Sequence, residues 1–255
     1  MLHPSAIIHP QANIGLGCEI GPYCVIGEHV TLGDGCKLHS HVVVDGHTTL
    51  GKENEIFPFA SIGLKTQDLK WKGGSTRTEI GDKNTFREYV TIHSATGDGE
   101  VTRVGSNNHI LAYCHLAHNV TLGNHNIMSN VATLGGHVTV EDHAVIGGLA
   151  AVHQFCRIGR LAMIGGCSKV VQDVPPFMMA DGNPAETRTI NKIGMERNGV
   201  SEEAQAALKH CYKILFREGL TISNALAKIG TDVAKLPEVL HLLNFVRTSE
   251  RGISK

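Results

Sequence analysis

The chain has 255 residues, a formal net charge of −1 at neutral pH, and 42% hydrophobic residues. This charge balance excludes a basic surface for nucleic acid or for an anionic membrane, while the hydrophobic content suffices for a large core. No apolar run approaches the roughly 20 residues that span a bilayer, and the start of the chain does not resemble a signal peptide. We therefore expect a cytoplasmic protein with reduced cysteines and no membrane span.

An aliphatic or aromatic residue recurs every six positions along most of the chain. The period runs from Ile8 to Ile62, resumes from Ile80 to Ile92, and continues from Val104 to Val170. Neither an amphipathic helix nor an alternating strand keeps a period of six over such a length. The pattern predicts a solenoid in which each hexad forms one short strand and one corner. Three hexads then close one coil of a triangular prism, and stacked coils form parallel ladders.

Glycine and other small residues occupy fixed positions in the hexads. Glycine often follows the periodic residue, as at Gly15 and Gly33, where a side chain would clash at a corner or where φ is positive. The fourth residue after the aliphatic is mostly small, and most of the seven cysteines lie there: Cys18, Cys24, Cys36, Cys114 and Cys156. We interpret these thiols as small buried groups rather than redox or metal-binding groups. The hexad resembles the repeat of the left-handed parallel β-helix acyltransferases.

Two polar segments interrupt the period and are predicted to leave the prism. The first covers residues 64–78 and contains the sequence Gln67-Asp68-Leu69-Lys70; the second covers residues 94–103. Loops that project from a rigid scaffold commonly carry binding groups. Functionless insertions are the alternative interpretation.

Counting hexads brings several of the sixteen histidines together. Because three hexads make one coil, Ile92 is expected to stack with Leu116, and Leu116 with Leu134. The same count places Gly136 one coil from the neighbourhood of His118. The histidines that then share one edge of the prism, within roughly 15 Å, are His93, His118, His137 and His153, and His115 is expected on the adjoining stretch of the same coil as His118.

The pattern changes after Val170. Prolines such as Pro175 and Pro184 interrupt the ladder because they cannot donate a hydrogen bond to it. From Ser201, an N-capping residue, the period becomes helical and continues to Gly219. Two further helices are predicted at residues 221–229 and 237–247, where they could cover the open end of the solenoid. We therefore predict a mainly β protein, with a left-handed parallel β-helix at 1–185 and an α-helical domain at 186–255.

Two chemistries use a cluster of imidazoles. A zinc site requires three of them about 2.0 to 2.1 Å from one metal ion, whereas a general base requires one imidazole within reach of a substrate hydroxyl. The spacing shows no acidic partner for a metal ligand, so we favour a base and predict no metal. A zinc-dependent enzyme similar to the γ-type carbonic anhydrases and a non-catalytic trimeric scaffold remain as alternatives.

Longer motifs then indicate one family. Together with Gln67 to Lys70 and Thr91-Ile92-His93, they resemble the acyl-carrier-protein–UDP-N-acetylglucosamine O-acyltransferases, which act first in lipid A synthesis. The resemblance covers essentially the whole chain and implies transfer of an (R)-3-hydroxyacyl group from acyl carrier protein to UDP-N-acetylglucosamine, with no cofactor. Whether the acceptor has a 3-hydroxyl or a 3-amino group stays open. The motifs are His115-Leu116-Ala117-His118-Asn119, Leu134-Gly135-Gly136-His137-Val138, Ala151-Val152-His153-Gln154-Phe155-Cys156, Gln172-Asp173-Val174-Pro175-Pro176 and Asp181-Gly182-Asn183-Pro184.

The resemblance also implies residue roles. His118 matches the general base, and the backbone N–H of Gly136 matches the donor to the oxyanion. Gly166 and Lys169 match the acyl groove, where the long Lys169 side chain is expected to favour shorter acyl chains. The positions that match the nucleotide-sugar site are Gln67, Asp68, Lys70, His93, His115, His137, His153, Gln154, Asn191 and Arg197.

Departures from the family pattern also bear on the site. Asn119 stands where many members carry Asp, and an amide cannot stabilise an imidazolium by charge. His118 should therefore be a weaker base or be oriented by another group. Asn198 replaces a second basic residue after Arg197, which affects the phosphate contacts. Because the family is trimeric, we expect a homotrimer with clefts between prisms, in which Asp68 of one subunit, together with Lys70, faces His118 of another.

Overall fold

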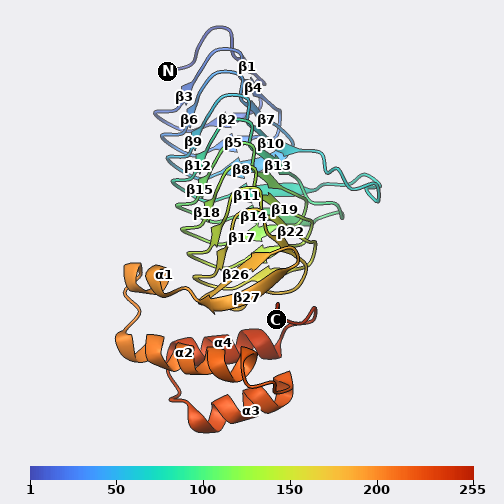
Figure 1. Cartoon of the computed structure of the whole chain (residues 1–255). Helices are drawn as coiled ribbons and strands as arrows, with labels where there is room; N and C mark the ends of the chain where they lie inside the picture. Colours follow the sequence, from blue (N-terminus) through green and yellow to red (C-terminus); the bar gives the residue numbers. More distant parts are fainter.

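The computed structural model describes all 255 residues as a tall three-sided prism that stands on a base of helices (Figure 1). Successive hexads supply different faces of the prism, and each third hexad returns to the same face. β16 (His115–Leu116), for example, pairs in parallel with β19 (Thr133–Leu134), eighteen residues further along the chain. The predicted left-handed parallel β-helix is confirmed.

Three sheets form the faces. The first contains, in spatial order, β1 (Ile7–Ile8), β4 (Val25–Ile26), β7 (Val43–Val44), β10 (Ser61–Leu64), β13 (Thr91–His93), β16, β19, β22 (Ala151–Val152) and β25 (Lys169–Val170). The second contains β2 (Asn13–Ile14), β5 (Thr31–Leu32), β8 (His47–Leu50), β11 (Arg77–Ile80), β14 (Val101–Val104), β17 (Thr121–Leu122), β20 (Thr139–Val140) and β23 (Arg157–Ile158). The third contains β3 (Glu19–Ile20), β6 (Lys37–Leu38), β9 (Glu55–Ile56), β12 (Thr85–Phe86), β15 (His109–Ile110), β18 (Ile127–Met128), β21 (Val145–Ile146), β24 (Met163–Ile164), β26 (Met178–Gly182) and β27 (Ala185–Ile190).

The periodic aliphatic residues form one continuous core inside the prism. Ile56, Leu116 and Leu134 are fully buried, and they belong to a cluster of 41 buried residues. Burying one such side chain stabilises the fold by roughly 1.5 to 3 kcal/mol. The narrow fourth position is confirmed as well, because the cysteines predicted there are buried and unbridged.

Most glycines that follow the periodic residue allow close stacking and do not need unusual dihedral angles. A Cβ added to Gly33 would lie 2.5 Å from the carbonyl carbon of Gly51 in the next coil, so no side chain fits. Positive φ instead occurs at the third residue after the aliphatic, at non-glycine residues such as Tyr113, Asn119 and His125. The expected clash is therefore confirmed at Gly33, and the expected positive φ occurs at Gly63, where φ is +80°.

A ladder of buried asparagines runs inside one corner of the prism. The pattern of small residues in the hexads does not predict it. The Oδ1 atom of Asn54 accepts bonds from the backbone N–H and from the side-chain amide of Asn84, at 3.0 and 2.9 Å. Asn84 binds Asn108 in the same way, and Asn108 accepts a backbone bond from Asn126. These bonds satisfy most of the buried polar groups of the ladder, and the Nδ2 atom of Asn126 at its end has no partner.

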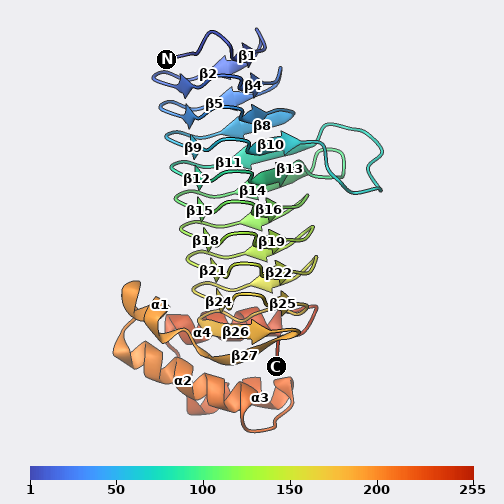
Figure 2. The same ribbon diagram turned by 45° about the horizontal axis from the view of Figure 1, so that its top comes forward.

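Both excursions leave the prism at the corner between the first and second sheets, on adjacent coils (Figure 2). They are shorter than predicted, 65–76 and 94–100, because β11 and β14 extend the ladder on one side. We name this corner the loop edge. The corner between the second and third sheets, which carries His125 and His143, is the polar edge; the corner between the third and first sheets, which carries Tyr89 and Tyr113, is the apolar edge.

The helical domain closes the C-terminal end of the solenoid, as predicted (Figure 1). The strands continue past residue 185, because β27 extends to Ile190 as an antiparallel partner of β26. A short helix that the sequence did not indicate comes next, α1 (Lys192–Arg197). The three predicted helices follow as α2 (Glu202–Phe216), α3 (Ile222–Asp232) and α4 (Pro237–Arg247), with Ser201 capping α2. A second cluster of 17 buried residues joins these helices to Leu161 and Phe177 of the solenoid. None of the helices has the length and apolar character needed to span a bilayer.

Candidate active site

The histidine cluster lies on the loop edge, and the stacking predicted from the hexads is confirmed. Ile92 pairs with Leu116, and Leu116 with Leu134, in the register that the count requires. The ring centroids of His93 and His115 are 5.3 Å apart. Those of His118 and His137 are also 5.3 Å apart, with the rings nearly perpendicular at 87°. His153 and Gln154 are exposed one coil further on, where His153 Nδ1 contacts the Gln154 carbonyl oxygen at 3.0 Å.

Burial keeps the inner histidines neutral. Burial, followed by the nearby His93 and His118, lowers the pKa of His115 from 6.5 to about 4. The pKa values of His93 and His137 are lowered for the same reasons, with burial as the larger cause. His93 is only 8% exposed, and its Nδ1 atom has no partner within the chain. Neutral imidazoles can donate and accept hydrogen bonds, which suits recognition of sugar hydroxyls.

His118 is oriented by Asn119. Its Nδ1 atom lies 2.9 Å from Oδ1 of Asn119, and that oxygen also accepts a bond from the backbone N–H of Thr96 at 3.1 Å. The backbone N–H of Asn119 in turn donates to the Thr102 hydroxyl at 2.8 Å. Because a carbonyl oxygen only accepts, Nδ1 of His118 must carry the proton. The Nε2 atom is then left with a free lone pair, as a general base requires.

Gly136 lies directly against the His118 ring. A Cβ at this position would be 2.5 Å from both Cε1 and Nε2 of the imidazole, so only glycine lets the ring lie there. The corner is held from both sides, because the His137 N–H donates to the His118 carbonyl and the Phe155 N–H to the Gly136 carbonyl. The N–H of Gly136 itself donates to no backbone carbonyl.

Asp68 reaches the same imidazole from the first excursion. Its Oδ2 atom is 3.7 Å from Nε2 of His118, while its Oδ1 atom accepts the backbone N–H of Lys70 at 2.9 Å. His118 and Asp68 are both largely covered, with side chains 14% and 21% exposed. The expectation that Asp68 faces His118 of another subunit is therefore wrong for this chain, because the excursion folds back over its own edge. Gln67 and Lys70 lie beside Asp68 with exposed side chains.

A row of outward side chains leads from the cluster along the first sheet. It runs from Thr91 through His115, Thr133 and Ala151 to Lys169, each paired with the next. Lys169 lies three ladder steps from His115, roughly 14 Å. Between His115 and Lys169, the row therefore contains only small side chains, and the long Lys169 side chain ends it.

Asn191 and Arg197 do not join the cluster within one chain. Asn191 precedes α1 and Arg197 ends it, and this helix lies at the base on the side away from the excursions (Figure 1). The Asn191 side chain is only 8% exposed and caps α1, with Oδ1 accepting the Gly194 N–H and Nδ2 donating to the Leu161 carbonyl. Arg197 is exposed. Gly166 lies on the apolar edge, next to Lys169 in the same coil.

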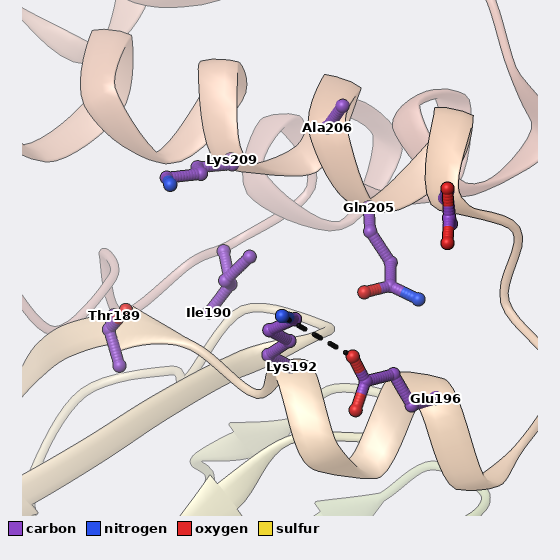
Figure 3. A pocket seen from close by; sticks show the side chains of 8 residues that line it. Thr189, Ile190, Lys192, Glu196, Gln205, Ala206 and Lys209 are labelled. Atoms are coloured by element: carbon purple, nitrogen blue, oxygen red, sulfur yellow. Dashed lines mark ion pairs between the residues drawn. The ribbon is translucent and has the colours of Figure 1, made fainter.

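A separate hollow of about 400 Å³ lies between α1 and α2 (Figure 3). Lys192 and Glu196 pair along α1 at 3.5 Å, on one side of the hollow, and Lys209 of α2 lies on the other side. It contains no histidine, and of its two acids, Glu196 and Glu202, the first is already paired with Lys192. The loop edge is therefore the better candidate for the active site.

The loop edge also does not offer a metal centre. Nowhere in the chain do three or more His, Cys, Asp or Glu side chains converge in a way that could hold a metal ion. The zinc-dependent alternative gains no support from this arrangement.

Comparison with known proteins identifies the family of this chain. Residues 173–254 match the family model described as UDP N-acetylglucosamine O-acyltransferase, domain 2, and residues 11–46 match the bacterial transferase hexapeptide model. The chain is 50% identical to the acyl-carrier-protein–UDP-N-acetylglucosamine O-acyltransferase of Thermodesulfovibrio yellowstonii, over 100% of this chain and 99% of that protein. The chain belongs to this O-acyltransferase family. The O-acyltransferase of Thiobacillus denitrificans is 48% identical over 99% of this chain and 98% of its own length. A UDP-N-acetylglucosamine acyltransferase structure from Bacteroides fragilis superposes with a TM-score of 0.98 at 39% identity, covering 100% of both chains.

One contact of this O-acyltransferase site was not foreseen from the sequence. The side-chain amide of Asn119 donates to Oε2 of Glu100 at 2.7 Å, so a carboxylate from the second excursion stands behind the His118–Asn119 pair. Glu100 lies just before the point where the hexad period resumes. That position brings it near the loop edge, but its partner depends on the path of the excursion, which the period does not encode.

Proposed function

We propose that this chain transfers a 3-hydroxyacyl group from the thioester of acyl carrier protein to the glucosamine 3-position of UDP-N-acetylglucosamine, with His118 as the general base. The observation that carries this proposal is the contact between the His118 ring and Gly136, whose N–H has no backbone partner. A base and an oxyanion donor are the two groups that acyl transfer to a hydroxyl requires. Names of close relatives give the substrate class.

In the proposed reaction, Nε2 of His118 removes the proton from the 3-hydroxyl or 3-amino group of the sugar. The oxygen or nitrogen of that group attacks the carbonyl carbon of the thioester at the same time. The N–H of Gly136 stabilises the negative charge that develops on the carbonyl oxygen. The carbon–sulfur bond then breaks, and His118 returns the proton to the departing thiolate. No metal or cofactor is needed for these steps.

The acyl chain is proposed to lie along the first sheet, over Thr133 and Ala151, towards Gly166 and Lys169. The sugar is proposed to bind between Asp68 and the neutral histidines. Asn191 and Arg197 lie too far from this edge to contact the same sugar within one chain, as described above. We propose that a neighbouring copy supplies Arg197, while Asn191, whose buried side chain caps α1, only positions that helix.

The apolar edge supports a homotrimer as part of the proposal. Its exposed rings stack on one another, with centroids 4.8 Å apart for Tyr89 and Tyr113. Contiguous exposed apolar surface marks protein interfaces. Exposed apolar side chains of this edge include Tyr23, Phe59, Tyr89, Tyr113, Val131 and Leu149. A cytoplasmic location also belongs to the proposal, since all seven cysteines are free and such thiols are usual in a reducing compartment.

The test is a transfer assay with purified protein, 3-hydroxyacyl carriers, and either UDP-N-acetylglucosamine or its 3-amino analogue. We expect His118→Ala to lower kcat by about 10² to 10⁴, while His125→Ala on the polar edge keeps full activity. Absence of transfer to either acceptor would refute the proposal and favour a scaffold, whereas unchanged activity in His118→Ala would show that another group is the base. The mass in solution should be three times 27.4 kDa.

A further inference from the structure

Glu100 is the charged residue of the second excursion that reaches the histidine cluster. Its Oε2 atom accepts the Asn119 side-chain amide at 2.7 Å and the backbone N–H of Gly97 at 2.8 Å. Asp98, the other acid of this excursion, instead accepts the Ser75 N–H and so ties the two excursions together. The carboxylate of Glu100 is therefore held by its own loop and aimed at Asn119.

The contacts of Asn119 leave its amide only one orientation. A backbone N–H can only donate, so the atom that faces the Thr96 N–H must be Oδ1. An ionised carboxylate can only accept, so the atom that faces Glu100 must be Nδ2. A flipped amide would lose both bonds and would present an NH₂ group to His118. Glu100 and Thr96 together thus determine which nitrogen of His118 carries the proton.

We propose that Glu100 is a positioning residue for the transfer reaction, which fixes the tautomer of His118 through Asn119 and supplies the negative charge that the amide lacks. The inference rests on the function proposed above. The residue after His118 is Asn119, which carries no charge. The orienting charge comes instead from Glu100, in a second segment of the chain. The second excursion thereby gains a function.

The charge of Glu100 persists at neutral pH. The hydrogen bond from Asn119, followed by that from Gly97, lowers the pKa of this carboxyl below its usual range. When His118 accepts a proton, a carboxylate one amide away stabilises the imidazolium and so favours proton removal from the acceptor. The other titratable groups that face His118 are Asp68, His93, His115 and His137.

The test compares Glu100→Gln, Asn119→Asp and the double variant in kcat, KM and pH profile. In Glu100→Gln we expect kcat to fall about tenfold and KM for the sugar to change less than about twofold. The acidic limb of the pH profile should move to lower pH because the imidazolium loses a favourable charge. Asn119→Asp places a carboxylate directly on His118, so in that background Glu100→Gln should cost less than about twofold.

Glu79→Gln is the matched control, since Glu79 lies on β11 and pairs with Arg103 at 3.3 Å, outside the cluster. Thermal unfolding of every variant reports on folding. Activity of Glu100→Gln within twofold of the wild type overturns the inference. A tenfold loss that persists unchanged in the Asn119→Asp background also overturns it, because Glu100 would then serve only the loop.

A second measurement separates this inference from the proposed function. In protein labelled with ¹⁵N-histidine, with His118→Ala to assign the signal, nitrogen chemical shifts report the tautomer without any substrate. We expect wild-type His118 to carry its proton on Nδ1 and Glu100→Gln to show a mixture. If the wild type transfers no acyl group, the proposed function fails while this result still stands, and an identical tautomer in both proteins refutes the positioning role.

Discussion

The loop edge and the polar edge of the prism both stack histidines, yet only one of them has the partners for chemistry. On the polar edge, His125 and His143 lie parallel, with centroids 4.8 Å apart and an interplanar angle of 3°. On the loop edge, His118 meets His137 edge-on and has Asp68 at 3.7 Å from one nitrogen and Asn119 at 2.9 Å from the other. Stacked histidines therefore follow from the hexapeptide repeat and do not by themselves indicate a catalytic site.

The difference comes from the two excursions. The hexad supplies identical backbone positions at every edge, so it can stack imidazoles but cannot surround one of them. The excursions at 65–76 and 94–100 bring Asp68 and Glu100 to the loop edge, from segments outside the repeat. The prism thus provides a rigid base for His118 and Gly136, and the inserted segments provide its charged partners.

The largest expected effect that distinguishes the edges is at Gly136. Gly136→Ala would push a methyl group into the His118 ring, whose Cε1 and Nε2 atoms would be 2.5 Å away. The imidazole must then rotate, and the N–H of residue 136 loses its place beside the thioester. We expect kcat to fall about 10² to 10³-fold in the transfer assay, as for loss of an oxyanion donor.

Gly230→Ala provides the control, because a Cβ at that position in α3 meets nothing within 4 Å. It should retain wild-type kcat. Both variants should unfold near the wild-type temperature if the damage at residue 136 is local. A Gly136→Ala protein with wild-type activity would show that the contact between the ring and the glycine does not matter for the reaction.

The repeat itself could be predicted almost completely from the sequence. The period of six determines which residues face inward, and Ile92, Leu116 and Leu134 stack as counted. The predicted ends of the excursions are less accurate, because the strands that follow them, β11 and β14, contain additional polar residues that do not follow the hexad. The path of β27 was missed because its partner is antiparallel and outside the repeat.

The site was predictable to the extent that it follows from stacking. His118 and Gly136 are neighbours because of the eighteen-residue coil, and this needed only counting. Asp68, by contrast, was assigned to another subunit, since nothing in a polar loop sequence indicates the direction in which it folds. The bond between Asn119 and Glu100 joins residues nineteen apart across an irregular segment. Contacts of this kind depend on the path of the chain in space, which the sequence pattern does not indicate.

The histidine cluster at the loop edge also makes the stability of the fold depend on pH. The pKa of His115 in the fold is about 4, lowered from 6.5 mainly by burial, so the folded chain keeps this imidazole neutral where the unfolded chain protonates it. Between those two values the unfolded state binds more protons, and stability therefore falls as the pH falls from about 6.5 to about 4. We expect the loss to be on the order of 1 to 3 kcal/mol.

His115→Gln should flatten this part of the stability profile, measured by urea unfolding at several pH values. His109→Gln serves as the control, because His109 occupies the same strand position on the third sheet but is exposed. Its profile should match that of the wild type. An equally steep decline in His115→Gln would assign the acid sensitivity to other groups, such as His93.

The smallest expected effect concerns the face that adjoins the loop edge. Lys169 ends the row of small residues that begins below His115, three ladder steps away. Its side chain stands where an acyl chain that follows Thr133 and Ala151 would continue. Lys169→Gly should therefore shift the preference towards longer 3-hydroxyacyl chains, by about tenfold in the ratio of kcat/KM values, which is the effect expected for one or two methylenes.

Carriers with a series of chain lengths, assayed with both proteins, measure this shift. Lys37→Gly is the control, since Lys37 is also an outward strand lysine but lies on the third sheet and pairs with Glu55. Because glycine weakens a strand at either position, a change in preference seen only at residue 169 identifies a steric effect of that side chain. An unchanged preference in Lys169→Gly would mean that the acyl chain leaves the row before reaching Lys169, and the groove would then have to follow a different face of the prism.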